Sequence, residues 1–187
     1  MARTAAVRIR EAGPADATGI AEVKVTTWRG AYRGIVPDAV LEGLSVEEVR
    51  REWLPGLSRH DPAVSHFVAE EPGGRIVGFA TCGPRRAGPE AYAGELYAIY
   101  VLAEAQGSGL GRALVRAVAR RLAERGMRSM LLWVFAENAA GRRFYERLGG
   151  KVVDEAGFEL GGRWLREVAY GWEDTAPLLA PGGRRRT

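Results

Sequence analysis

The sequence predicts an α+β protein in a single domain, with a twisted, mainly antiparallel sheet flanked by helices. Three observations lead to this fold class. The chain has 187 residues, a length that suits one domain. Strand-like segments occur in pairs around glycine-rich turns, which is typical of hairpins. Helical segments interrupt the strands only at intervals, in the order β-α-α-β-β-β-α-β-α-β-β, whereas a doubly wound fold would alternate the two.

A strand and two helices are expected in the first third of the chain. Residues 6–11 alternate apolar side chains with arginines, a pattern typical of a short strand. Apolar side chains then recur at helical spacing over residues 14–32. Ser45, followed three residues later by Glu48, is a capping box and predicts a second helix over residues 46–57.

Six strands and two helices are expected in the remainder. Glycine pairs at 73–74 and 161–162 indicate two hairpins. One helix carries an apolar stripe opposite a row of arginines and ends at Gly126. The predicted elements are strands at 65–70, 75–82 and 95–101, a helix at 110–125, a strand at 129–135, a short helix at 138–148, and strands at 151–160 and 164–172.

We expect one folded domain over residues 5–174 and a disordered basic tail over residues 175–187. The tail contains prolines, glycines and the three arginines 184–186, a composition that does not favour a packed core. These arginines supply most of the formal net charge of +4, so about +1 remains for the domain. So small a charge does not indicate nucleic-acid binding, and no nucleic-acid partner is predicted.

The sequence also bears on the compartment. It has no run of about 18 apolar residues, so no membrane span is expected. Its one cysteine, Cys82, has no partner for an internal disulfide, which favours a reducing compartment. We therefore expect a cytoplasmic protein without a membrane partner.

A glycine-rich turn between a strand and a helix is the most informative segment. Gly107, Gly109 and Gly111 follow the strand at 95–101 and open the helix at 110–125. A helix start presents free N–H groups and a positive dipole end, which suits a phosphate. Glycine lets the backbone approach such a group closely. The pattern indicates a phosphate-binding turn, with a turn that binds no ligand as the alternative.

Two familiar phosphate-binding motifs do not fit this turn. A Walker loop ends in Gly-Lys-Ser/Thr, whereas this turn ends in Gly-Leu-Gly-Arg. A dinucleotide fingerprint that starts at Gly107 needs a glycine where Arg112 stands. One that starts at Gly109 needs a glycine where Leu114 stands.

The turn resembles the Q/R-x-x-G-x-G/A motif of the GNAT superfamily of N-acetyltransferases. Asn138, Phe144 and Tyr145 resemble a second segment of that family, and the resemblance extends over residues 75–150. Ala103 stands where the family often has proline, and Gly150 where a large apolar residue is common. The resemblance implies the GNAT fold, in which the sheet is splayed at the cofactor strand. The turn itself is Gln106-Gly107-Ser108-Gly109-Leu110-Gly111.

The resemblance implies acetyl-CoA as co-substrate. The pyrophosphate would bind to the backbone N–H groups from Gly107 to Arg112, which include those of Ser108 and Leu110. The Arg112 side chain would add a contact. The strand residues Ile99, Tyr100 and Val101 would pair with the pantetheine arm as if it were another strand. Asn138 would contact the same arm; its alternative role is a helix N-cap.

Acetyl transfer to an amine requires two proton movements. An alkylammonium must lose a proton before it attacks, and the leaving thiolate must gain one. Glu95 lies at an offset from the turn similar to that of a catalytic glutamate in part of the family, and would be the base. Its alternative role is a salt-bridged glutamate at the strand edge. Tyr145 resembles the tyrosine that faces the thioester sulfur, and would be the acid unless it only packs.

The acceptor is expected to be a primary amine of a small molecule, peptide or protein. Trp28 and Tyr32 share a helix face and would line its pocket, with core packing as the alternative.

No metal site is expected, because His60 and His66 have no partner at ligand spacing. Transfer would be direct, in a ternary complex. Homodimers are common in the family. The rival hypothesis is a non-catalytic CoA-sensing or partner-binding module with the same fold.

Overall fold

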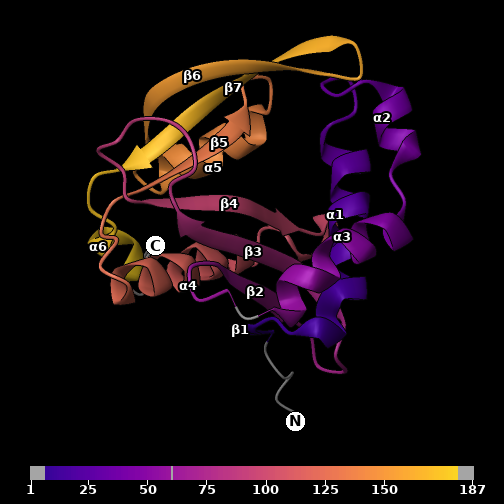
Figure 1. Ribbon diagram of the computed structural model, residues 1–187, viewed down its shortest axis with the longest axis horizontal. Coiled ribbons are helices and arrows are strands. Elements are labelled where there is room, and N and C mark those ends of the chain that lie inside the picture. The colour runs from indigo at the N-terminus through magenta and orange to yellow at the C-terminus, as the bar shows by residue number, and fades with distance from the viewer. Residues whose placement is uncertain (1–6, 60, 181–187) are drawn as a thin grey trace, which may run out of the picture.

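The structure is a computed structural model that describes residues 7–59 and 61–180. Its centre is a seven-stranded sheet in the order β1-β2-β3-β4-β5-β7-β6 (Figure 1). Every pair of neighbours is antiparallel except β4 and β5, which are parallel. The predicted α+β class and mainly antiparallel sheet are confirmed. The strands are β1 (Arg8–Glu11), β2 (Ser65–Glu70), β3 (Ile76–Pro84), β4 (Gly94–Val101), β5 (Met130–Phe135), β6 (Lys151–Leu160) and β7 (Arg163–Trp172).

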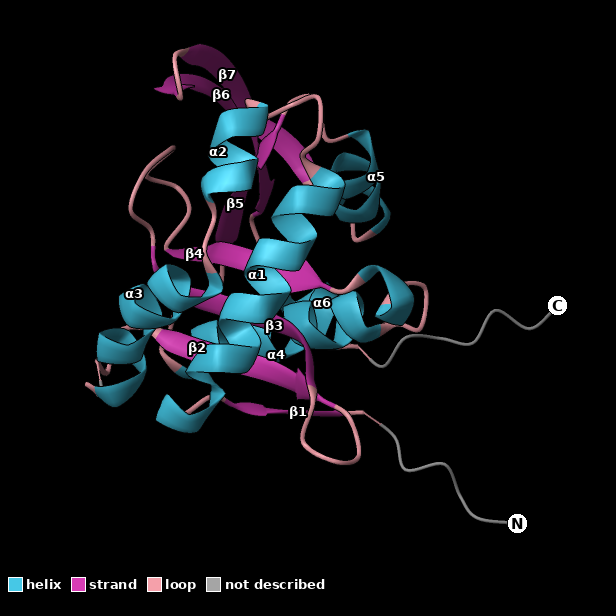
Figure 2. Cartoon of the chain, turned by 90° about the vertical axis from the view of Figure 1, so that its right-hand side faces the viewer, coloured by secondary structure: helices cyan, strands magenta, loops and turns pink. Residues whose placement is uncertain are grey.

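Helices cover both faces of the sheet. Helix α1 lies in front of strands β3 and β4 in Figure 2, and α4 lies behind them. The β6–β7 hairpin extends across the top of the molecule towards α2 (Figure 1). The helices are α1 (Ala17–Ala31), α2 (Asp38–Gly43), α3 (Val46–Ser58), α4 (Leu110–Glu124), α5 (Ala139–Arg147) and α6 (Ala176–Leu179), with 3-10 turns η1 (Pro14–Asp16) and η2 (Ala103–Ala105).

The two faces of the sheet bury separate cores. On one face, Leu114, Val118 and Leu122 of α4 pack against β3, β4, β5 and β7. On the other, Ile20 and Val23 of α1 pack against β2 and β3. Each helix presents its apolar stripe to the strands and its charged side chains to solvent, as the periodicity predicts. Burial of these stripes fixes the helices to the sheet and thereby positions the turn before α4.

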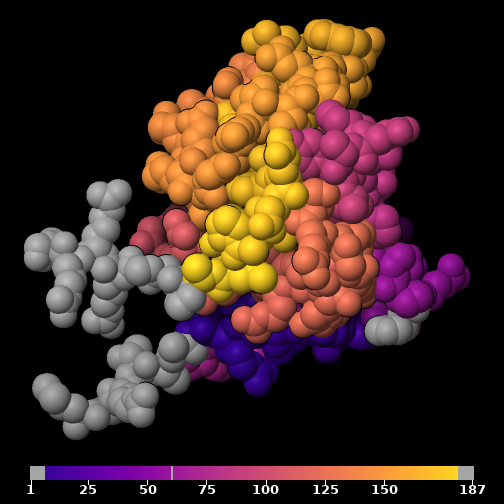
Figure 3. All heavy atoms as spheres, turned by 90° about the vertical axis from the view of Figure 1, so that its left-hand side faces the viewer, coloured from indigo at the N-terminus to yellow at the C-terminus, as the bar shows by residue number. Residues whose placement is uncertain are grey.

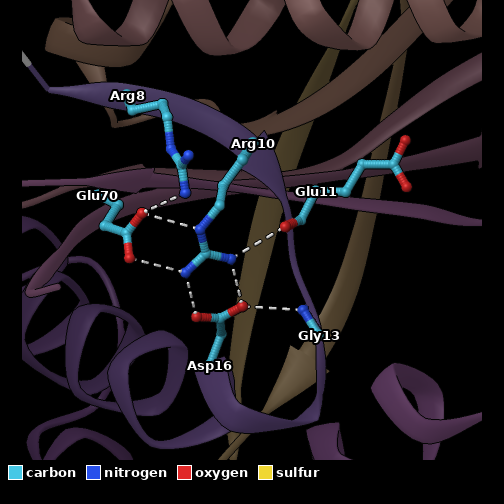
Figure 4. Close-up of polar contacts among 6 residues, drawn as sticks. All are labelled: Arg8, Arg10, Glu11, Gly13, Asp16 and Glu70. Atoms are coloured by element: carbon cyan, nitrogen blue, oxygen red, sulfur yellow. Dashed lines mark hydrogen bonds and ion pairs between the residues drawn. The ribbon is translucent and has the colours of Figure 1, made fainter.

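A partly buried ion network ties β1 to the start of the first helical segment. The Arg10 guanidinium donates to both carboxylate oxygens of Asp16, each at 2.7 Å, and to Glu70 at 2.9 and 3.1 Å (Figure 4). The backbone N–H of Gly13 donates to the same Asp16 carboxylate at 2.8 Å. Arg10 therefore holds an edge strand, its neighbour β2 and η1 together through two bidentate contacts.

The predicted start of the disordered tail, at residue 175, is wrong, because residues 175–180 are part of the folded domain. Thr175 is 1% exposed, and its N–H donates to the Arg128 carbonyl oxygen at 2.8 Å. Helix α6 follows, and its Leu178 packs into the core beside α4. Figure 3 shows this segment, in yellow, lying against the body of the protein. Residues 175–180 are thus ordered by Leu178 burial, and the rest of the predicted tail, 181–187, lies outside the described residues.

Candidate active site

The glycine turn has the backbone conformation that only glycine adopts easily. Gly107 has φ +73° and Gly109, the N-cap of α4, has φ +90°. A Cβ at either position would meet no protein atom within 4 Å, so both glycines face open space. The N–H groups of Gly107, Ser108 and Gly109 make no hydrogen bond within the described part of the chain. The turn therefore presents free donors that fit an anion.

Two side chains of the turn hydrogen-bond to the backbone that precedes them. The Gln106 amide donates to the Val101 carbonyl oxygen at 2.9 Å, and the Ser108 hydroxyl donates to the Ala105 carbonyl oxygen at 2.6 Å. Gln106 also lines the cavity described below, whereas Ser108 and Leu110 do not. The predicted contribution of Ser108 and Leu110 thus rests on their backbone N–H groups alone.

The sheet opens directly beside this turn. Strands β4 and β5 pair only at Gly94 with Met130 and at Glu95 with Leu131, and beyond that point they are no longer paired. A cavity of about 1020 Å³ occupies the gap and continues to the turn. Ile99, Tyr100 and Val101 line it from β4. The unpaired edge matches the expected splay, and an extended arm would fit along it as an additional strand.

A β-bulge in the pairing of β3 with β4 determines which side chains of β4 face α4 and which face α1. The register shifts between Thr81 and Cys82, opposite Tyr97. Leu96, Ile99 and Val101 belong to the core below α4, while Ala98 and Tyr100 pack beside α1. The α1 side is called the acceptor face here. It is the face onto which Trp28, Tyr32 and Phe135 also project.

Glu95 lies in the cavity wall and is also an ion-paired glutamate. It is 3% exposed. One carboxylate oxygen accepts from the backbone N–H of Arg86 at 2.7 Å, and the other accepts from the Arg86 guanidinium at 2.8 and 3.3 Å. The guanidinium also lies 3.7 Å from the centre of the Tyr97 ring. Glu95 thus lies in the cavity, as the catalytic role requires, and is also part of a salt bridge, as the alternative role predicted.

Tyr145 reaches the cavity from the opposite face of the sheet. Its ring packs on α5 near Phe144, Tyr170 and Trp172, with ring centres 5.3, 5.9 and 6.5 Å away. Its hydroxyl makes no hydrogen bond to any residue described. Burial, with a smaller contribution from Tyr100, raises the pKa of Tyr145, so the phenol keeps its proton at neutral pH.

The other predicted residues also lie around the cavity. Asn138 lines it and caps α5, because its side-chain oxygen accepts from the Gly141 N–H at 3.0 Å. Arg112 lines it from the start of α4. Trp28 and Tyr32 line it at the acceptor face, with ring centres 5.1 Å apart. The fold therefore brings every predicted site residue to one cavity or to the turn that borders it.

Sequence reasoning missed several residues of the acceptor face, and three of them carry charge or a ring that matters for the site. Arg86 lies in the loop after β3, where no periodicity marks it. Phe158 of β6 and Glu167 of β7 line the cavity from the closing hairpin. The alternation along β7 contained a signal for Glu167. Its neighbour Val168 belongs to the core below α4, so Glu167 has to face the other side.

The cysteine lies outside the cavity, and the described residues form neither a metal-ligand cluster nor a membrane-spanning helix. Cys82 is buried in the core, and burial raises the pKa of its thiol to about 12. Within residues 7–59 and 61–180, no group of three or more potential metal ligands comes together. In the same ranges no helix has the length and apolar character needed to cross a bilayer.

Comparisons with known proteins agree with this geometry. The model of the Acetyltransferase (GNAT) family matches residues 28–150. N-acetyltransferase YuaI of Bacillus subtilis (strain 168) is 41% identical over 172 residues, which cover 92% of this chain and 96% of that protein.

Two solved structures share the fold. PaiA N-acetyltransferase of Thermoplasma acidophilum, in complex with coenzyme A, has a TM-score of 0.69 at 21% identity and covers 87% of this chain and 98% of that one. The yncA protein of Salmonella typhimurium, solved with its cofactor acetyl-CoA, has a TM-score of 0.67 at 24% identity and covers 97% and 99%.

Proposed function

Because the chain belongs to the GNAT family and is an acetyl-CoA-dependent N-acetyltransferase, we propose that it acetylates a primary amine of a small molecule, peptide or protein by direct attack in a ternary complex. The supporting observation is the cavity, which extends from the glycine turn through the β4–β5 gap to the acceptor face. Both substrates would meet there without an acyl-enzyme, since Cys82 lies outside the cavity.

The residues present fit acetyl-CoA. Gly107 and Gly109 offer unbonded N–H groups in open space, and the Arg112 side chain stands beside them. Asn138 and the edge of β4 from Ile99 to Val101 border the path towards the gap. When bound, acetyl-CoA supplies an acetyl group activated as a thioester.

Glu95 would receive the proton that the acceptor loses. The Arg86 guanidinium pairs with this carboxylate and holds it in the cavity wall. The Arg86 side chain is 60% exposed, so it is able to move aside or to leave room for a bridging water. Deprotonation gives the amine nitrogen the free electron pair with which it forms the new C–N bond.

Tyr145 would supply the proton that the sulfur needs. As the C–S bond breaks, the sulfur keeps the bonding electron pair, and the Tyr145 hydroxyl donates its proton there. The acetylated nitrogen gives up its second proton, which restores the phenol. Glu95 and Tyr145 lie on opposite faces of the sheet, so each would serve one side of the gap.

Binding and turnover test this function separately. Acetyl-CoA should raise the Tm, because a ligand that binds only the folded state stabilises it by mass action. Release of free CoA should then depend on an added amine. A thermal shift without amine-dependent release, over a broad amine panel, would favour the non-catalytic CoA-sensing module. Absence of both would contradict the proposal.

We also retain the cytoplasm as the proposed compartment. The one cysteine, Cys82, is free and buried in the structure, which fits a reducing environment. The proposed partners remain acetyl-CoA and the amine acceptor.

A further inference from the structure

Glu167 is a carboxylate of the acceptor face that the proposed chemistry does not use. It lies in the middle of β7, opposite Phe135 of β5 and Ala156 of β6. It is half-buried and lines the cavity. Leu165, two residues earlier on the same strand, packs into the cluster that contains Tyr32 and Phe135. The alternation of the strand therefore directs Glu167 to the side from which the acceptor would enter.

The charge of Glu167 has no partner among the residues that the structure describes. It forms no ion pair and no side-chain hydrogen bond with any residue in the described ranges, whereas Glu95 is matched by Arg86. Burial, followed by repulsion from Glu95, raises the pKa of Glu167. The other arginines of the cavity, Arg112 and Arg147, belong to α4 and α5 and thus to the cofactor side. A half-buried carboxylate without a counter-ion is stabilised by a cation that enters with the ligand.

Aromatic rings surround this position. The Tyr32 and Phe135 rings meet edge to face with centres 4.9 Å apart, and Phe158 stacks near Phe135 at 6.2 Å. Trp28 packs against Tyr32, and its buried indole N–H has no hydrogen-bond partner in the described chain. A wall of this kind favours a flat apolar group and a cation near a ring face.

We propose that Glu167 binds the ammonium group of the acceptor and that the preferred acceptors are arylalkylamines without a carboxylate. In such amines a short alkyl chain links the nitrogen to an aromatic ring, so the ring would contact the aromatic wall while the ammonium pairs with Glu167. A carboxylate beside the amine would be repelled by Glu167. This inference rests on the proposed acetyl transfer to an amine and adds the class of acceptor.

A matched pair of acceptors tests the role of Glu167. 2-Phenylethylamine and phenylalanine share the ring and the amine and differ by one carboxylate. The wild-type enzyme should prefer phenylethylamine in kcat/KM. Glu167→Gln should raise the KM for phenylethylamine by about tenfold or more, as expected for a lost charge pair of at least about 1.4 kcal/mol, and should reduce the preference equally. Its kcat should change much less than that of Glu95→Gln.

A control variant and a binding measurement separate this role from folding and from turnover. Glu159→Gln, on the exposed side of neighbouring β6, should leave both KM values and the preference unchanged. The acetyl-CoA-induced Tm shift should be the same in all variants. With CoA saturating, phenylethylamine should raise the Tm of the wild type further and that of Glu167→Gln much less.

Each outcome decides one hypothesis. An unchanged KM and preference in Glu167→Gln would contradict the assignment of Glu167, and a wild-type preference for phenylalanine would contradict the acceptor class. If no amine releases CoA but the Glu167-dependent Tm shift persists, the ammonium site holds and the proposed transfer fails.

Discussion

Tyr145 illustrates how one residue combines packing with a reactive position. Its ring packs against three aromatic side chains, while its hydroxyl has no protein partner among the residues described. Removal of the hydroxyl alone leaves the packing in place. The residue therefore allows chemistry and stability to be measured independently.

Tyr145→Phe should lower turnover by about 10²–10⁴-fold, the usual contribution of a lost general acid or base. The Tm and the acetyl-CoA-induced shift should stay close to those of the wild type, because the ring remains. Single-turnover mixing is the appropriate measurement, since product release would mask a chemical step. Tyr92→Phe, which changes a buried tyrosine outside the cavity, is the control. Wild-type single-turnover rates in Tyr145→Phe would leave Tyr145 with a packing role only.

At the residue scale, the sequence was informative where a motif marked the position. The resemblance pointed to Glu95, Asn138 and Tyr145, and all three line the cavity. Arg86 was missed because a loop residue contacts Glu95 only through the tertiary fold. Glu167 was missed because a single charge in a strand usually faces solvent, although its alternation with the buried Val168 directs it to the cavity side.

At the scale of elements, the turn between β4 and α4 depends on glycine for two different reasons. Gly109 needs a positive φ and faces open space. Gly111 has no such φ, but a Cβ there would lie 3.1 Å from the Phe144 ring. The sequence predicted that all three glycines admit a phosphate. The structure adds that Gly111 lets α4 and α5 approach each other, so its substitution would disturb Phe144 as well.

Gly109→Val should abolish stabilisation by acetyl-CoA, because a branched side chain would occupy the open space beside the free N–H groups. The control is Gly126→Val at the other end of α4. Gly126 also has a positive φ, +79°, and a Cβ added there would meet no atom within 4 Å. Both variants should lose similar stability from backbone strain. Thermal shifts with and without acetyl-CoA provide the measurement. A full shift in Gly109→Val would remove the turn from the binding site.

Most elements were predictable because their periodicity extends over several turns or residues. Helix α4 and strands β2 and β6 have the expected positions within a residue. The short helices α2 and α6 were not predicted, since six and four residues are too few for a helical pattern to show. Helix α6 forms because Leu178 finds a place beside α4, a contact that only the assembled core provides.

At the scale of the whole molecule, the Arg10 network joins the edge of the sheet to the helical layer. The Arg10 guanidinium holds the pKa of Asp16 below its usual value, since its hydrogen bonds outweigh the cost of burial. A carboxyl with a lowered pKa in the folded state adds stability above its unfolded pKa of about 4. That stability is lost as the pH falls through the lower, folded pKa.

Asp16→Asn should therefore reduce the free energy of unfolding by about 2 kcal/mol at pH 7, the usual contribution of hydrogen bonds to charged groups. The deficit relative to the wild type should shrink as the pH falls below about 4, where the Asp16 carboxyl becomes protonated first in the unfolded state and, at lower pH, in the folded state. Urea unfolding from pH 3 to 7 measures both quantities. A deficit that stays constant over this range would show that the Asp16 charge does not contribute.

The opening between β4 and β5 leaves two strand edges without a partner, and such edges bear on self-association. Unpaired strand edges at a protein surface recruit other strands, and aggregation follows. Here the two free edges beyond Glu95 and Leu131 lie inside a cavity, walled by aromatic side chains on one side and by α5 on the other. A slender, flexible ligand would fit along them, as the proposed pantetheine arm does. The fold thereby places its unpaired strand edges in a cavity rather than at the rim of the sheet, where another strand would pair with them.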